Sequence, residues 1–329
     1  MDIAVADWSE ILGVLKETHG IWSSGLDKSR YYHYIWWQLH SIWGRRNYLY
    51  LVGRENRRIV TSCKLYTLEF FSAGGFFRLA GLGAIFTPEE FRGQGCAGRF
   101  IKKLRARCRD LGYDGLLLHS DIDPGFYERV GFEPLGGHDF HIFLVDAPVA
   151  QKVITLPGFV EDMQAEPVEI TALDVCHIPS ANRHHRRWLA RRPYGLIRSE
   201  QYWSYKIQRE NYVAKHCPSN WPGLEMIGTN IGCSSGGYAI FEKGKRIVRV
   251  LEVVGAEDVR QALWRHILRS AWLGGTALIR GFEGAAPESV PQILFAGRDW
   301  GSPMLLPLNK ALFRWAAVSP CPLLEFDHF

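Results

Sequence analysis

The sequence lacks the patterns that mark membrane, secreted and disulfide-rich proteins. None of its apolar runs approaches the roughly 20 residues that a helix needs to cross a bilayer. Its 7 cysteines include no Cys-x-x-Cys pair, and such an odd, scattered set is typical of free thiols in a reducing compartment. Residues Met1 to Asp7 place no basic region before an apolar core, so we expect no signal peptide and a cytoplasmic location.

A strong excess of one charge is also missing. The net charge of +5 is mild and is not by itself the footprint of a nucleic-acid-binding protein. The basic run from Arg183 to Arg187 has no interleaved aromatic residues for base stacking, which favours a solvated helix face. His184 and His185 belong to this run, so we predict an exposed basic helix there and no metal site.

The composition is that of a globular protein with sizeable cores. The chain has 329 residues, of which 47% are hydrophobic and 22% charged, and this length suggests two domains. Much of its aromatic content lies early, because seven Trp and Tyr residues fall between Ile21 and Trp43. We expect some of these rings to pack in a core and others to cover a binding site.

The most informative stretch runs from Phe77 to Leu135. An apolar strand, Leu79 to Phe86, ends at a proline, which cannot donate to a sheet. A glycine-rich loop, Arg92 to Gly98, follows and leads into an amphipathic helix whose apolar face is expected to include Leu111. The loop therefore directs backbone N–H groups and the positive end of a helix dipole at one point, which predicts an anion site that fits a pyrophosphate.

Two motifs in this stretch resemble the GCN5-related N-acetyltransferase (GNAT) superfamily. Arg92 to Ala97 has the spacing Arg-x-x-Gly-x-Ala of that family's acetyl-CoA loop, directly after a strand. About thirty residues later, Phe126 to Phe132 (FYERVGF) is similar to its tyrosine-bearing helix. The resemblance implies an acetyl-CoA-dependent acyltransferase with an α/β fold.

A weaker repeat of this order of elements follows in the second half. Three antiparallel strands precede the loop and helix, and strands at Gly115–His119 and Phe140–Val145 complete a first domain, residues 1–146. We predict a linker over 147–168 and a second, degenerate GNAT-like domain with a C-terminal tail over 169–329. The junction near Gly255 carries two acids and lacks the loop spacing, so this copy is not expected to hold CoA. An unrelated α/β domain is the alternative.

The resemblance also assigns roles to individual residues. It implies that the pantetheine arm pairs with the strand that ends at Phe86 and that the glycine loop holds the pyrophosphate. The implied cofactor-binding residues are Ala84, Ile85, Phe86, Arg92, Gly93, Gln94, Gly95, Cys96, Ala97, Gly98 and Ser120. Tyr127 stands where the family places the acid that protonates the departing thiolate.

The base that deprotonates the acceptor amine is not evident. Leu79 to Phe86 contains no acidic residue, although many family members carry one on or near this strand. Glu69, His119 and Asp121 are candidates, and so is the terminal carboxylate of Phe329, which some tandem relatives use. We assign the base to Phe329 at this point, because an aromatic tail can anchor the carboxylate in a cleft.

The sequence thus predicts an enzyme that moves an acetyl group from acetyl-CoA to the amine of a small molecule or peptide. Transfer of a longer acyl group is one alternative. A CoA-binding regulatory or scaffold protein with little turnover is another, because the strand lacks a carboxylate. Neither nucleic acid nor a membrane is expected as a partner.

Overall fold

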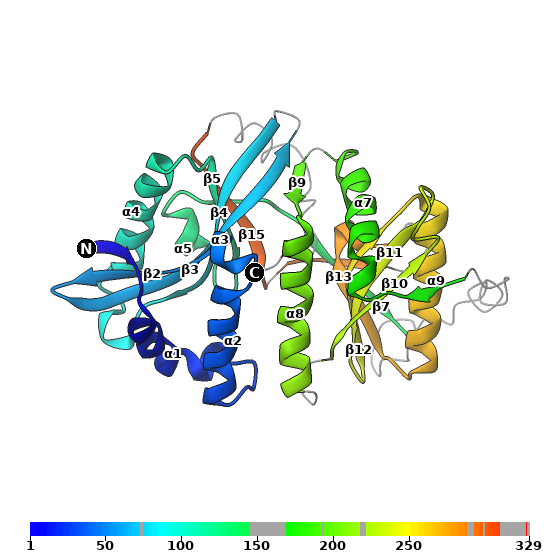
Figure 1. The fold of residues 1–329 in the computed structure, drawn as a ribbon, viewed down its shortest axis with the longest axis horizontal. Helices are drawn as coiled ribbons and strands as arrows, with labels where there is room; N and C mark the ends of the chain where they lie inside the picture. The colour runs from blue at the N-terminus through cyan, green and yellow to red at the C-terminus, as the bar shows by residue number, and fades with distance from the viewer. Residues whose placement is uncertain are drawn as a thin grey trace.

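The computed structural model describes residues 1–72, 75–144, 169–192, 194–217, 222–287, 293–298, 300–309 and 327. Within these residues two mixed β-sheets stand side by side, with α2 (Lys28–His40) and α8 (Glu200–His216) between them (Figure 1). The fold class is therefore α/β with two mixed sheets, as the sequence predicts. The segment 147–168 that we predict as a linker lies outside the described residues.

The first sheet contains eight strands among the described residues, in the order β1-β2-β3-β4-β5-β15-β6, with β9 on an extension of β3. Its strands are β1 (Asp2–Val5), β2 (Tyr48–Glu55), β3 (Arg58–Ser72), β4 (Gly75–Phe86), β5 (Gly115–Ser120), β6 (Glu133–Pro134), β9 (Tyr194–Ile197) and β15 (Ser302–Pro307). Neighbours are antiparallel except β4 and β5, which run parallel.

The second sheet has seven strands in the described part of the chain, in the order β14-β7-β13-β12-β11-β10-β8. Its strands are β7 (His138–Phe143), β8 (Thr171–Ala172), β10 (Leu224–Thr229), β11 (Gly237–Lys243), β12 (Ile247–Val254), β13 (Leu278–Phe282) and β14 (Leu294–Gly297). Here β12 and β13 are the parallel pair. The predicted series of hairpin, helix and strand in the second half is confirmed.

Helices cover both sheets and fill the space between them (Figure 1). The remaining helices are α1 (Trp8–Trp22), α3 (Gly44–Asn47), α4 (Cys96–Asp110), α5 (Gly125–Glu128), α7 (Ile178–Leu189) and α9 (Glu257–Leu273), with 3-10 turns at Glu89–Phe91, Val175–His177 and Glu283–Ala285. Across the described residues, none of these helices combines the length and the apolar character that spanning a bilayer would take.

Two predictions about individual helices are wrong. His184 and His185 are buried on α7, where a ring nitrogen of His184 lies 3.0 Å from the carbonyl oxygen of Ile231 and His185 packs against Trp188. Their burial lowers the pKa of both imidazoles, so the helix presents arginines to solvent and neutral histidines to the core. Leu111, expected on the apolar face of α4, is exposed because the helix ends at Asp110.

The two sheets exchange strands, which corrects the expected placement of the strand at 140–145. That strand, β7, pairs with β13 and β14 of the second sheet. In its place β15, from near the C-terminus, inserts between β5 and β6 of the first sheet. Met304, Leu305 and Leu306 of β15 are almost completely buried, so this apolar strand completes the first core. The division of the chain at residue 146 stays a prediction, but the sheets do not separate there.

A buried arginine joins the two halves. Arg198 follows β9, which pairs with β3 of the first sheet, and its guanidinium forms two hydrogen bonds of 2.9 and 2.7 Å with Glu252 on β12 of the second sheet. Its Nε donates to Asp327 at 2.8 Å. Arg198 and Glu252 have no exposed surface, and Tyr238 donates a further hydrogen bond of 2.6 Å to Glu252. A cation here holds two sheets and the C-terminal segment together.

We expect Arg198→Met to lower the free energy of unfolding by about 3–5 kcal/mol, because it leaves two carboxylates buried without their cation. Denaturant unfolding followed by tryptophan fluorescence measures the change. The matched control is Arg30→Met, which removes an exposed ion pair with Asp27 and is expected to cost less than about 1 kcal/mol. Equal stability of the two variants would show that the buried cluster does not join the halves.

Candidate active site

The parallel strands β4 and β5 part where the sequence predicts the cofactor. Their register runs from Leu79 and Gly115 to Leu82 and Leu118 and then stops, although both strands continue. From Gly83 to Phe86, the edge of β4 that faces β5 therefore has no strand partner among the described residues. An unpaired strand edge offers backbone donors and acceptors to an extended ligand.

A β-bulge shapes β4 at this point. Lys64 lies opposite Gly83 and Ser62 opposite Phe86, so Ala84 and Ile85 together face the single residue Cys63 of β3. Ala84 has φ of 48°, which is uncommon for a residue with a side chain. The hydroxyl of Thr61 donates to the carbonyl of Phe86 at 2.9 Å and secures the far side of the bulge.

The glycine loop follows and ends at the N-terminus of α4. Gly93 and Gly95 have φ of 74° and 72°, which a glycine adopts without strain. Gly95 is the N-cap of α4, and no side chain caps this end within the described residues. The first N–H groups of the helix therefore point at solvent with the positive end of its dipole, as an anion site requires.

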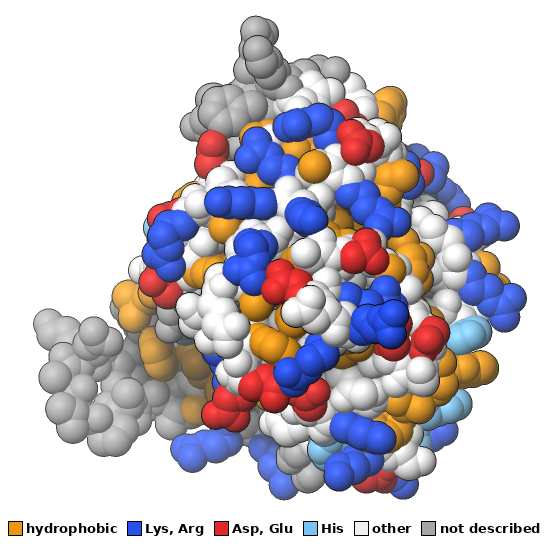
Figure 2. Space-filling model, turned by 90° about the vertical axis from the view of Figure 1, so that its left-hand side faces the viewer, with side chains coloured by type: hydrophobic (Ala, Val, Ile, Leu, Met, Phe, Trp, Pro, Cys, Tyr) orange, Lys and Arg blue, Asp and Glu red, His pale blue; other side chains and the backbone are white. Residues whose placement is uncertain are grey.

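An arginine holds this loop in shape. Arg99 on the first turn of α4 donates at 2.6 Å to the carbonyl of Gln94 and forms an ion pair of 3.1 Å with Glu55 on β2. Gln94 in turn donates to the carbonyl of Glu90 at 2.7 Å. These bonds fix the conformation of the loop at the start of the helix. The end of the molecule where the first sheet and α4 lie carries many Lys and Arg side chains (Figure 2).

Tyr127 lies on α5, in the core beneath the parted strands. Its ring packs against Phe126 and Phe132 in edge-to-face contacts and is mostly buried. Burial, and after it the nearby charge of Asp121, raises the pKa of Tyr127 to about 12. Its hydroxyl forms no hydrogen bond within the described residues. It therefore keeps its proton at neutral pH and is available to a ligand.

A cavity of about 250 Å³ opens beside the bulge, between the two halves of the protein. From the first half it is lined by Gly83 and Ala84 of β4, by Asp121, and by side chains of α1, α2 and β3. From the second half it is lined by α8, β11 and β12. Trp22 and Tyr34 of the aromatic stretch line it, whereas Tyr31 and Trp43 are buried in the core.

The charged residues of the cavity mostly form pairs. Arg209 and Lys206 contact Glu210, with N–O distances of 2.6 and 3.5 Å, and Arg249 contacts Glu242 at 3.1 Å. Lys64 also lines the cavity, and it forms neither an ion pair nor a hydrogen bond with the described residues. The sequence pattern did not indicate these residues, because they come from segments far apart in the chain.

Of the other residues that the sequence predicts for the site, only some line the cavity. Asp121 lines the cavity, but Glu69 is exposed and borders a separate hollow with Asn47 and Tyr202. The hydroxyl of Ser120 donates to the carbonyl of Ile122 at 2.8 Å, so it stabilises the turn that follows β5. Phe329 lies outside the described residues, and its role as the base stays a prediction.

In the second sheet the parallel strands also separate, but a side chain occupies the gap between them. The register of β12 and β13 stops after Val250 and Gly281, and β11 and β12 share a register shift near Phe241. Here the guanidinium of Arg260 on α9 donates at 2.9 Å to the carbonyls of both Val253 and Ala286. This side chain bridges the two segments, so the described part of the second half offers no comparable strand edge.

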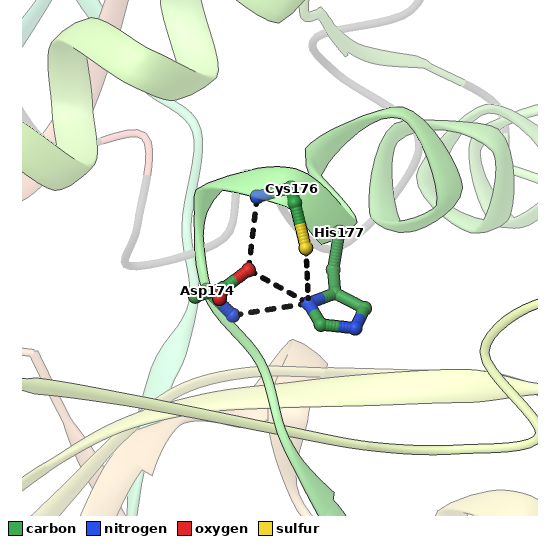
Figure 3. Close-up of side chains that lie close together, drawn as sticks. All are labelled: Asp174, Cys176 and His177. Carbon is green, nitrogen blue, oxygen red and sulfur yellow. Dashed lines mark hydrogen bonds and ion pairs between the residues drawn. The ribbon is translucent and has the colours of Figure 1, made fainter.

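Two other groupings have structural explanations. Asp174, Cys176 and His177 place potential metal-ligand atoms within 4.8 Å of one another (Figure 3). The Asp174 carboxylate accepts from the Cys176 amide at 2.9 Å and caps a 3-10 turn, and the His177 ring reaches back to the same residue. Gly232 to Gly236 has the spacing Gly-x-Ser-x-Gly, but it joins two antiparallel strands rather than a strand and a helix, so it forms no nucleophile elbow.

Comparison with known proteins agrees with this geometry. Residues 14–135 match the family described as the acetyltransferase (GNAT) domain. No curated protein sequence matches the chain. The solved structures that it resembles include GCN5-related N-acetyltransferases from Kribbella flavida and Anabaena variabilis, with TM-scores of 0.62 and 0.65 and identities of 12% and 15%. The matches cover 92% of this chain and 70% and 72% of those chains.

Saccharomyces cerevisiae N-myristoyltransferase, solved with myristoyl-CoA, also matches, with a TM-score of 0.54 and 11% identity over 93% of this chain and 78% of that chain. Likenesses at such identities establish the fold alone. The family match is narrower, but it spans the bulged strand, the uncapped helix and the buried tyrosine. Over residues 14–135 the chain therefore matches the GNAT acetyltransferase family.

Proposed function

We propose that this protein is an N-acetyltransferase that moves the acetyl group of acetyl-CoA to an amine bound in the cavity between its two halves. The observation that carries the proposal is the convergence of three features in one place. Among the described residues, the end of β4 lacks a partner strand, α4 lacks a side-chain cap and the Tyr127 hydroxyl lacks a hydrogen bond. These elements meet in one core, which contains Leu82, Phe100, Leu118 and Tyr127. The acceptor is the amine of a small molecule or a peptide.

The first half supplies the binding site for the acyl donor. Backbone groups of Ala84, Ile85 and Phe86 would pair with the pantetheine arm, and one amide would donate to the thioester oxygen as that oxygen gains charge. The N–H groups from Gly93 to Gly98 would bind the pyrophosphate. The filled gap near Arg260 supports a single CoA site per chain.

Tyr127 would act on the leaving group. A CoA thiolate leaves more readily when a donor stabilises its charge, and the buried hydroxyl keeps its proton throughout the neutral range. The two halves would hold donor and acceptor in contact, which is worth about 7–11 kcal/mol in well-aligned reactions. The second half thus contributes to the acceptor site without binding CoA.

Turnover with defined substrates tests this proposal. Acetyl-CoA, butyryl-CoA and myristoyl-CoA are each combined with spermidine, Nα-acetyl-lysine methylamide and glycinamide, and the released thiol is measured. We expect acetyl transfer to at least one amine, and preference for a longer chain would identify an acyltransferase of different specificity. Tight CoA binding without turnover on any amine would instead support a regulatory or scaffold protein.

Gly95→Glu should abolish CoA binding, because its carboxylate would lie beside the N–H groups that bind the pyrophosphate. Isothermal titration with CoA measures the affinity, and we expect a loss of at least ~10-fold, since like charges in close contact cost several kcal/mol. Gly112→Glu is the control. Gly112 has φ of 75° and lies after the far end of α4, so this variant carries the same backbone strain away from the loop. Similar CoA affinity in both variants would contradict the loop assignment.

Tyr127→Phe should retain CoA affinity and lower kcat by ~10²–10⁴-fold, the usual effect of removing a catalytic acid. Tyr113→Phe is the control, because Tyr113 belongs to the same core and its hydroxyl bonds to Thr67 at 2.7 Å. Steady-state kinetics and CoA titration are measured for both. An unchanged kcat in Tyr127→Phe, with chemistry shown to limit the rate, would remove Tyr127 from the mechanism.

A further inference from the structure

We propose that the amine of Lys64 is the general base that accepts the proton of the attacking acceptor amine. The inference rests on the proposed acyl transfer and supplies the group that the acid-free strand β4 lacks. Lys64 lies on β3 opposite Gly83, next to the bulge at Ala84 where the thioester would be bound. Its side chain lines the same cavity as Ala84 and Asp121.

Lys64 differs from the other lysine of the cavity in its contacts. The other lysine of the cavity, Lys206, pairs with Glu210 at 3.5 Å and is only 2% exposed. Lys64 is partly exposed to the cavity and forms no hydrogen bond or ion pair with the described residues. A buried or half-buried lysine without a counter-ion is costly in its charged form, which favours the neutral amine that a base needs.

The groups that surround Lys64 in the cavity favour its neutral form. The acids of the cavity are Asp121, Glu210 and Glu242, and the latter two are in contact with Arg209 and Arg249. Tyr34 and Tyr66 also face the cavity, and burial keeps both phenols neutral by raising their pKa values. Burial, and after it the charge of Arg209, lowers the pKa of Lys64 to about 7. A base of this strength is half deprotonated near neutral pH.

The reaction then balances as follows. The nitrogen of the acceptor forms a bond to the acetyl carbon, the carbon–sulfur bond breaks, and the electron pair of that bond goes to sulfur. The amine of Lys64 takes one proton from the attacking nitrogen, and the hydroxyl of Tyr127 donates to the departing sulfur. Exchange with water in the cavity returns both side chains to their starting states.

Lys64→Arg separates this role from anion binding. The guanidinium keeps the positive charge but holds its proton at any accessible pH, so it cannot act as a base. In the wild type, kcat/KM should rise with pH through about 7 as Lys64 loses its proton, and then level off. Lys64→Arg and Lys64→Met should both lose this limb and lower kcat by ~10²-fold or more, with unchanged CoA affinity by titration. Lys16→Met, on the exposed surface of α1, is the control with normal kinetics.

Full activity in Lys64→Arg would overturn the proposal and show that Lys64 binds an anionic group of the acceptor. The base would be assigned elsewhere if Lys64→Arg retained the rise of kcat/KM through pH 7 and another variant lost it. The variants to compare are Lys206→Arg, Asp121→Asn and deletion of Phe329.

A measurement that needs no acceptor distinguishes failure of this inference from failure of the proposed function. Competitive labelling with acetic anhydride, read by mass spectrometry across pH, gives the pKa of Lys64 relative to exposed Lys16. A pKa near 7 in a protein without turnover would contradict the acyltransferase proposal alone. An ordinary lysine pKa, about 10.4, would contradict the role of Lys64 whatever the turnover.

Discussion

The burial of one guanidinium governs how the two halves of this protein meet. Arg198 has no exposed surface, so its charge must be balanced by groups that come to it. Glu252 comes from the second sheet and Asp327 from the end of the chain, while β9 fixes Arg198 to the first sheet. The cluster thereby ties the two sheets together across α2 and α8, which lie between them (Figure 1). Both helices contribute side chains to the lining of the cavity.

The local elements could be predicted from the sequence, but their partners could not. The apolar run Gly115–His119 forms a strand, and a helix begins after Gly95, as the hydrophobic pattern and the glycine loop predict. The exchange of β7 and β15 left no such signal. The apolar residues of β7 and β15 could pack in either sheet, and only long-range pairing decides between them. The sequence therefore indicated two sheets correctly and assigned the strand at 140–145 to the wrong one.

The candidate site likewise has a part that the sequence indicates and a part that it does not. The glycine loop and Tyr127 lie within one segment of about 40 residues, so their spacing carries a family signature that can be read directly. The cavity cannot be read this way, because Lys64 and Arg209 are about 145 residues apart in the chain. In the sequence Lys64 is one polar residue in a strand. Burial in the cavity, and after it the charge of Arg209 on α8, favours the neutral amine, and neither can be read from the sequence.

The two halves share a fold but differ in what occupies the gap between their parallel strands. In the first half the gap beside Ala84 is open and borders the cavity. In the second, Arg260 satisfies the backbone carbonyls on both sides, so no ligand is needed to complete the structure. The second half instead turns Arg209 and Arg249 toward the cavity. The charge of Arg209 contributes, after burial, to lowering the pKa of Lys64, and it would act in the same direction on an amine that enters. Under the proposed function, the half that does not bind the donor would prepare the acceptor, and Lys64 would take the proton that the transfer releases.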